Sequence, residues 1–148
     1  MLAGCQDIFS SSERAFYILN DVDTKFEDVI DAKGNVLPLT TGSYVDYLES
    51  ADETLRKSAF ENMYAAYGKV QNTMASLLNS QCKMLKYQSD LRGYSNALEA
   101  STNKNGVPSS VYKNLIAQVH KDIAPLHKYM NVRKKALNKD KLNMYDLY

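Results

Sequence analysis

Residues 52–91, DETLRKSAFENMYAAYGKVQNTMASLLNSQCKMLKYQSDL, carry the longest regular pattern of the chain and decide its fold class. Apolar side chains recur there at steps of three, four or seven residues, the spacing that places them on one side of a helix. They are Phe60, Met63, Tyr67, Val70, Met74, Leu77, Met84 and Leu91. Asp52 is the expected N-cap of this long helix, and Gly93 its expected end. Because Gly68 lies inside the run, we expect either a close helix approach or a break at Tyr67–Gly68.

Shorter elements are expected on both sides of the long helix. Two apolar and polar runs around a Gly-containing loop at 31–35 predict one small β-hairpin at about residues 24–39. Further helices are expected from Ser11 or Ser12 to about Asn20, after Thr41, over 94–101, and from Pro108 onward with a kink or restart at Pro125. The fold class is therefore mainly α, an antiparallel helical bundle with one hairpin, in a single domain spanning residues 1–148.

Composition suits a compact helical domain. Hydrophobic residues make up 45% of the chain and charged residues 24%, with 11 Tyr, 4 Phe and no Trp. Tyrosine buries a ring while its hydroxyl reaches water or a polar partner, so many of these residues should lie at the core's edge or line a cavity. No apolar run approaches the roughly 20 residues of a membrane span, and the N-terminus lacks a secretory signal. We therefore expect a cytoplasmic protein with no membrane partner.

The net charge of +1 hides a gradient along the chain. Residues up to Asn103 hold 14 acidic and 9 basic side chains, whereas the rest hold 3 and 9. A solvated basic helix face explains this better than a nucleic-acid site, because no Gly-aromatic or Arg-rich binding signature accompanies it. No nucleic-acid partner is expected.

The sequence contains no catalytic constellation. His120 and His127 are its only histidines, and Asp122 is their only acidic neighbour. A zinc hydrolase needs two imidazoles one helical turn apart and a further ligand, as in HExxH, which is absent. Cys5 and Cys82 lack CxxC spacing and fit reduced thiols. We therefore expect no catalytic, cofactor-binding or metal-binding residue in this chain.

Seven stretches, taken in order, carry a family resemblance. They are FYILNDVDTKF at 16–26, YLES at 47–50, RKSAFENMYAAYG at 56–68, RGYSNALEA at 92–100, PSSVY at 108–112, PLHKY at 125–129 and MYDLY at 144–148. In this order and spacing they resemble the oligoendopeptidase F family of zinc metallopeptidases, in the helical region that precedes the catalytic domain. The chain departs from the family pattern at Asn143, where a histidine is expected, and matches it weakly over 83–89.

The resemblance implies a function that this chain does not perform alone. In that family an HExxH helix and a further glutamate, downstream of the matched region, bind zinc at the bottom of a channel that admits only short peptides. The resemblance therefore implies that the chain is the N-terminal helical domain of such an enzyme, 1–148, a fragment of the region before the catalytic domain. It would form part of the channel wall, be inactive by itself, and have the missing catalytic domain as its partner. Zinc would belong to the full-length enzyme, and short peptides would be its substrates.

Two groups of residues are candidates for this role. Arg92 and Tyr94 are candidates for lining the substrate channel, because a guanidinium could meet a peptide carboxylate; a structural helix end is the alternative. Met144, Tyr145 and Tyr148 are candidates for contact with the catalytic domain, because an apolar, aromatic terminus is a poor exposed surface. The alternative function is a free-standing helical interaction module whose apolar end docks a partner.

Overall fold

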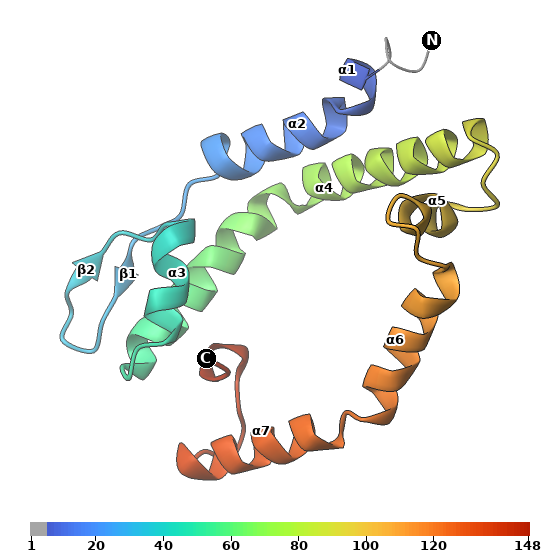
Figure 1. Ribbon diagram of the computed structural model, residues 1–148. Helices are drawn as coiled ribbons and strands as arrows, with labels where there is room; N and C mark the ends of the chain where they lie inside the picture. The colour runs from blue at the N-terminus through green and yellow to red at the C-terminus, as the bar shows by residue number, and fades with distance from the viewer. Residues whose placement is uncertain (1–5) are drawn as a thin grey trace. The chain divides into compact units, whose positions relative to one another are not determined.

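The computed structural model describes residues 6–148, most of which are helical (Figure 1). In chain order the elements are α1 (Gln6–Phe9), α2 (Ser11–Tyr17), the π-helix η2 (Ile18–Asp23), β1 (Val29–Ile30), β2 (Val36–Leu37), α3 (Thr41–Leu48), α4 (Glu53–Leu91), α5 (Ala97–Asn103), α6 (Ser109–Lys121), α7 (Ala124–Ala136) and the 3₁₀ helix η3 (Met144–Asp146). The prediction of a mainly α fold with one small hairpin is confirmed.

The chain divides into two compact units. Unit 1 comprises the residues up to Leu78 together with Leu142–Tyr148, and unit 2 comprises Asn79–Lys141. The last seven residues therefore belong with the first half of the chain, although they follow unit 2 in sequence. That residues 1–148 act as a single domain stays a prediction.

Helix α4 matches the boundaries that the sequence predicts. Asp52 Oδ1 accepts the N–H groups of Thr54 (2.8 Å) and Leu55 (3.3 Å), which is the expected N-cap. At Gly68 both expectations are wrong: the helix is not interrupted there, and a Cβ on this glycine would meet no other atom within 4 Å. The apolar periodicity of the surrounding residues therefore outweighs the low helix propensity of one glycine.

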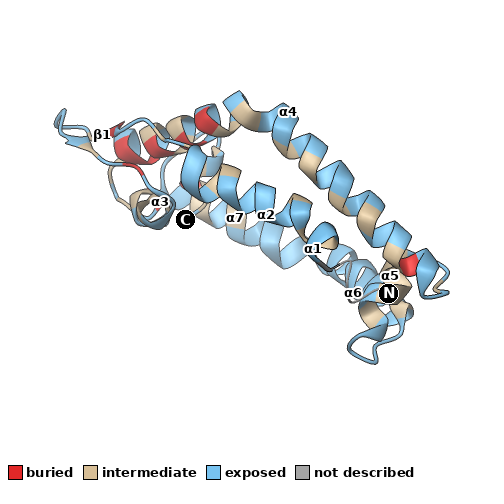
Figure 2. Ribbon diagram, turned by 90° about the horizontal axis from the view of Figure 1, so that it is seen from above, coloured by how far each residue is buried: buried red, intermediate tan, exposed pale blue. Residues whose placement is uncertain are grey.

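The hydrophobic core lies in unit 1, around the first half of α4 (Figure 2). All the buried apolar side chains among the described residues belong to this unit; they are Val29, Leu39, Leu48, Leu55, Ala59, Met63 and Ala66. Phe26, Leu37, Tyr44, Tyr47 and Tyr67 pack against this core from its edge. The tyrosines among them have the edge position that the composition predicts.

The hairpin is held on α4. Its antiparallel register pairs Val29 with Leu37 and Ile30 with Val36, around the expected five-residue loop. Val29 is fully buried, and the Ile30 N–H donates to Ser58 Oγ (3.1 Å). A strand pair this short is stable only against another element, and α4 is that element.

Two helix starts and one helix end differ from the sequence prediction. Helix α2 begins at Ser11 without a side-chain cap from Ser10, and Thr40 rather than Thr41 caps α3. The helix predicted to end near Asn20 extends further, because α2 continues after Tyr17 as the π-helix η2, which ends at Asp23. A hydrogen bond from the Tyr67 hydroxyl to Asn20 Oδ1 (3.2 Å) links η2 to α4. Periodicity cannot foresee such a contact, because the two residues are far apart in sequence.

Unit 2 contains the end of α4 followed by α5, α6 and α7. Asn96 caps α5, because its Oδ1 accepts the Glu99 N–H over 2.9 Å. Pro125 lies in the first turn of α7, where its missing N–H costs nothing, and the predicted restart at this proline is confirmed. Helix α6 exposes Val111, Leu115 and Val119 at 53%, 61% and 55%. Unit 2 thus presents an amphipathic helix whose apolar side chains lie at the surface.

Candidate functional site

The terminal segment, Leu142–Tyr148, is attached to α4 by a buried ion pair. Arg56 Nη2 lies 3.0 Å from Asp146 Oδ1, and the two side chains are 9% and 0% exposed. The guanidinium also donates from Nε to the Tyr145 carbonyl (3.1 Å), and from Nη1 to the carbonyls of Ser50 (2.9 Å) and Ala51 (3.1 Å). Arg56 therefore joins the turn before α4 to the terminal segment.

Asp146 also organises the terminal segment internally. Its Oδ2 accepts the Asn143 N–H over 3.0 Å and the Asn143 side-chain amide over 3.3 Å. One carboxylate oxygen thus faces Arg56, while the other caps η3. Because both oxygens of the fully buried carboxylate have donors, its charge is compensated.

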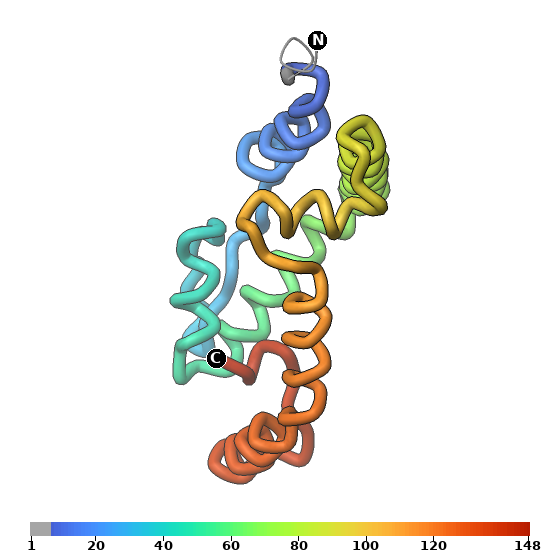
Figure 3. The backbone as a smooth tube through the Cα atoms, turned by 45° about the vertical axis from the view of Figure 1, so that its right-hand side comes forward, coloured from blue at the N-terminus to red at the C-terminus, as the bar shows by residue number. Residues whose placement is uncertain are grey.

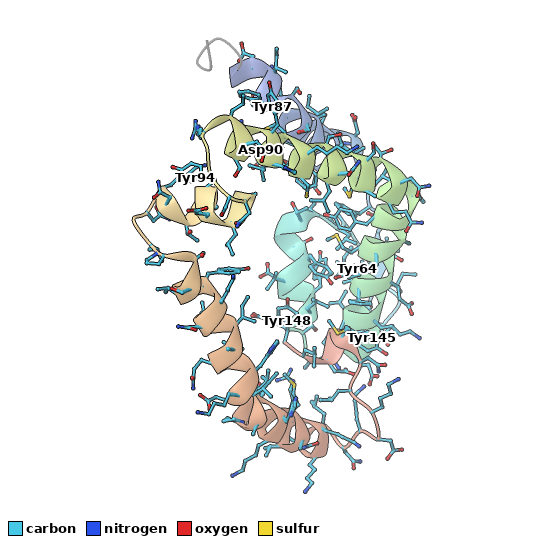
Figure 4. The ribbon with its side chains drawn as sticks, turned by 90° about the vertical axis from the view of Figure 1, so that its right-hand side faces the viewer. Tyr64, Tyr87, Asp90, Tyr94, Tyr145 and Tyr148 are labelled. Carbon is cyan, nitrogen blue, oxygen red and sulfur yellow. The ribbon has the colours of Figure 1, made fainter. Side chains whose placement is uncertain are left out.

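Aromatic rings extend this attachment along α4. The ring of Phe60 contacts that of Tyr64 in a tilted arrangement, with centroids 4.5 Å apart and an interplanar angle of 43°, and meets Tyr145 edge-on at 6.0 Å. In Figure 4, Tyr64, Tyr145 and Tyr148 lie at the same end of unit 1, beside α3. Burial, followed by the nearby hydroxyls of Tyr64, Tyr148 and Tyr67, raises the pKa of Tyr44 to about 12. Figure 3 shows the terminal segment beside the start of α4. The tyrosines of this group come from α3, α4 and the terminal segment.

The three residues predicted to contact a catalytic domain all lie in the terminal segment. Tyr145 is half-buried against Phe60, whereas Met144 and Tyr148 are 61% and 55% exposed. The segment is therefore anchored through Asp146 and still presents an apolar surface. Its contact with a catalytic domain stays a prediction.

Arg92 and Tyr94, the predicted channel residues, lie at the end of α4 in unit 2. The Gly93 N–H donates to the Asp90 carbonyl (3.1 Å), and the Tyr94 N–H donates to the Ser89 carbonyl (3.1 Å). With Gly93 at a φ of 74°, these two bonds form a Schellman motif. The Tyr94 hydroxyl accepts a hydrogen bond from Asn103 Nδ2 (2.7 Å), and Arg92 is exposed. Both residues thus form part of a helix end, and their role in a channel stays a prediction.

Residues 6–148 contain neither a metal-binding cluster nor a membrane-spanning helix. No group of three or more His, Cys, Asp or Glu side chains in that range is placed to hold a metal ion. His120 and His127 are exposed on α6 and α7. None of the helices in that range combines the length and the apolarity needed to cross a bilayer.

The ion pair is the feature that sequence analysis missed. Stepping back four residues from Phe60 along the apolar repeat reaches Arg56, so a charged side chain occupies a position of the apolar stripe. A charge on a core-facing stripe needs a buried partner. That signal was available, but it could not identify the partner, because Asp146 lies 90 residues further along the chain.

Comparison with known proteins now defines the class. The family model described as "Peptidase family M3" matches residues 46–148, a range that includes both Arg56 and the terminal segment. This chain belongs to peptidase family M3.

Three individual relatives that match this chain are described as oligopeptidases or oligoendopeptidases. Over all 148 residues the chain is 36% identical to oligopeptidase PepF of Bacillus subtilis and 36% identical to group B oligopeptidase PepB of Streptococcus agalactiae. It superimposes with a TM-score of 0.95 on 28% of the crystal structure of oligoendopeptidase F from Enterococcus faecium, covering 99% of this chain at 40% identity. The resemblance to the oligoendopeptidase F family is confirmed. The chain spans about a quarter of its curated relatives, 22% and 25% of these two.

Proposed function

We propose that this chain is the N-terminal helical domain of a zinc-dependent oligopeptidase, where it forms part of the wall that restricts the active-site channel to short peptides and does not cleave them itself. The observation that carries the proposal is the family match over residues 46–148, by a chain that spans only about a quarter of its relatives. The remaining three quarters of such an enzyme would supply the zinc and the reacting groups. We place the enzyme in the cytoplasm.

The wall role has a physical basis. Zinc activates a water molecule and polarises the scissile carbonyl, but the metal alone does not distinguish a short peptide from a folded protein. Size restriction needs protein on several sides of the metal, so that only a narrow, flexible substrate reaches it. A long helix such as α4, capped at one end by Asp52 and closed at the other by Gly93, is a rigid element for this purpose.

The exposed apolar surface of the chain is evidence for a large protein partner. Exposed apolar residues occur on α6 and in the terminal segment, including Leu115 at 61% and Met144 at 61%. Apolar side chains concentrated in this way typically mark an interface. We assign Met144, Tyr145 and Tyr148 to the contact with the catalytic domain.

A chimaeric enzyme tests the proposal. This chain would replace the matching 28% of the Enterococcus faecium oligoendopeptidase F, to which it is 40% identical. Cleavage would be measured on a short quenched peptide and on a long unfolded protein. We expect the chimaera to cleave only the short peptide, and the chain alone to cleave neither. Metal-dependent cleavage by the chain alone, or equal cleavage of both substrates by the chimaera, would contradict the proposal.

Arg92 is testable in the same enzyme. As a channel residue it would bind the substrate carboxylate, so Arg92→Ala should raise KM roughly tenfold for peptides with a free C-terminus and leave kcat unchanged. Amidated peptides serve as the control, because they lack the carboxylate. An equal effect on both peptide classes would contradict the channel role and favour a purely structural role for Arg92 at the helix end.

The alternative is a free-standing interaction module whose apolar end docks a partner, and the exposed apolar side chains of α6 offer it a second binding surface. It predicts that the chimaera is inactive, while the chain alone binds a protein partner through this helix. Leu115→Glu would then abolish that binding without unfolding the chain, because Leu115 is exposed.

A further inference from the structure

Unit 1 contains tyrosine hydroxyls that make no hydrogen bond within residues 6–148. They are those of Tyr44 in α3, Tyr64 in α4 and Tyr148 in the terminal segment. Two neighbouring tyrosines behave differently. The Tyr47 hydroxyl donates to the Pro38 carbonyl over 3.0 Å, and the Tyr67 hydroxyl is bonded to η2 as described above. Because a phenol can donate one hydrogen bond, the first group of hydroxyls can bind a ligand.

These hydroxyls belong to one patch of unit 1. Tyr44 packs against the edge of the core, and the ring of Tyr64 contacts that of Phe60 with centroids 4.5 Å apart, so each ring is held by a neighbour. Figure 4 shows Tyr64 and Tyr148 at the same end of unit 1, beside α3. Electrostatic interaction with Tyr64 and Tyr148 contributes, after burial, to the raised pKa of Tyr44, and such an interaction requires a short distance. Tyr44, Tyr64 and Tyr148 thus form a tyrosine patch.

The tyrosine patch combines accessible aromatic surface with hydrogen-bond donors. Tyr64 and Tyr148 are each 55% exposed, and Tyr44 is half-buried. Tyrosine rings give a large contact area at a low cost in conformational entropy, and they pack on side chains of many kinds. The patch itself contains no cation, which a carboxylate ligand would need for a strong hydrogen bond. It therefore suits a neutral acceptor such as a backbone carbonyl.

Backbone carbonyls are what an oligopeptidase can recognise in every substrate. Each peptide bond offers one, whatever the side chains are. Tyr148 belongs to the terminal segment, whose contact with the catalytic domain is part of the proposed function. The patch would then lie where the channel wall meets that domain, and a peptide on its way to the metal would pass it.

We propose that Tyr44 and Tyr64 form a substrate subsite, in which their hydroxyls donate hydrogen bonds to the backbone carbonyls of a short peptide. This inference rests on the proposed function and names the residues of the wall that touch the substrate. The two rings pack against substrate side chains without selecting one type. Both residues bind the peptide and take no part in breaking the bond.

Removing each hydroxyl in the chimaeric enzyme tests the subsite. Tyr44→Phe and Tyr64→Phe keep the rings and delete only the donors. Each should raise KM for a short peptide roughly three- to tenfold and leave kcat unchanged, because a neutral hydrogen bond to bound substrate is lost.

Tyr87→Phe is the matched control. Tyr87 lies on the same helix as Tyr64 and is 56% exposed, nearly the same as Tyr64, but it is outside the tyrosine patch (Figure 4). Its substitution should change neither KM nor kcat. An equal rise of KM in all three variants would contradict a subsite at Tyr44 and Tyr64.

Ester-containing substrates test the carbonyl contact itself. In a series of peptides each amide away from the cleaved bond is replaced in turn by an ester, whose carbonyl is a weaker hydrogen-bond acceptor. At the position that meets the tyrosines, the ester should raise KM in the unaltered enzyme. In the variant with both Phe substitutions the same ester should have a smaller effect, because the donors are already gone. A purely structural role of the hydroxyls would leave the ester effect equal in both enzymes.

The outcomes separate the inference from the proposed function. If both Phe substitutions leave KM unchanged while the chimaera still rejects the long substrate, the inference fails and the wall function stands. If they lower the melting temperature of the chimaera and leave KM unchanged, the hydroxyls contact the catalytic domain and the inference also fails. If the unaltered chimaera cleaves long and short substrates equally, the wall function fails, whereas a KM effect confined to Tyr44 and Tyr64 would still support the subsite.

Discussion

The Ala32 N–H donates to Asp52 Oδ2 over 2.7 Å, so the carboxylate that caps α4 also holds the loop of the hairpin. Its other oxygen accepts the N–H groups of Thr54 and Leu55. These backbone donors, Ala32 first, lower the pKa of Asp52 below 3.8. One side chain thus couples the start of the long helix to the hairpin, and the coupling depends on its charge.

This coupling predicts an acid-sensitive contribution to stability. Because the pKa of Asp52 is lower in the folded chain, its contribution is present above pH 3.8 and is lost as the pH falls below that value. Asp52→Asn should therefore flatten the pH dependence of the urea midpoint between roughly pH 7 and pH 3. Glu49→Gln, at an exposed residue of the same unit, is the control. Equal slopes for the two variants would contradict the prediction.

Tyr44 should make the stability of the folded chain sensitive to alkali. Burial raises its pKa from 10.0 to about 12, so the folded chain keeps it neutral where the unfolded chain ionises it. Its contribution to stability is present below pH 10.0 and is lost as the pH rises toward about 12. Absorbance titration of Tyr44→Phe should lack one late-ionising tyrosine. Tyr129→Phe, at a residue 52% exposed, should retain that late step.

Shortening the Met63 side chain in the core of unit 1 should lower the stability of the chain strongly. This side chain is 5% exposed among Val29, Leu39, Leu55 and Ala59. Met63→Ala should lower the free energy of unfolding by about 2–4 kcal/mol, because it leaves a cavity in a packed core. Urea denaturation of Met144→Ala, at a residue 61% exposed, gives the matched control. There we expect a change of less than about 0.5 kcal/mol.

Substitutions at two glycines, Gly68 inside α4 and Gly93 just after it, should change stability in opposite directions. At Gly68 the backbone is helical and a Cβ has free space, so Gly68→Ala should stabilise the chain by up to about 1 kcal/mol. At Gly93 the φ of 74° disfavours any side chain, so Gly93→Ala should destabilise it by about 1 kcal/mol. Thermal unfolding of both variants provides the comparison. A loss of stability in Gly68→Ala would indicate that α4 needs this glycine.

Local sequence rules foresaw much of the fold. The cap at Asp52, the end at Gly93, the hairpin loop at 31–35 and the restart at Pro125 each depend on residues only a few positions apart. Capping, turn geometry and the missing N–H of proline act over that range. The same rules misplaced the cap of α3 by one residue, since neighbouring threonines offer nearly equivalent oxygens.

The sequence by itself determined a long amphipathic helix, a small hairpin and a family resemblance that the comparisons confirm. The tertiary structure alone decided that the hairpin docks on α4 and that Arg56 meets Asp146. The reason is physical: helices, caps and turns form from neighbouring groups, whereas a buried charge finds its partner only when distant segments are brought together. In this chain, that partner lies 90 residues away.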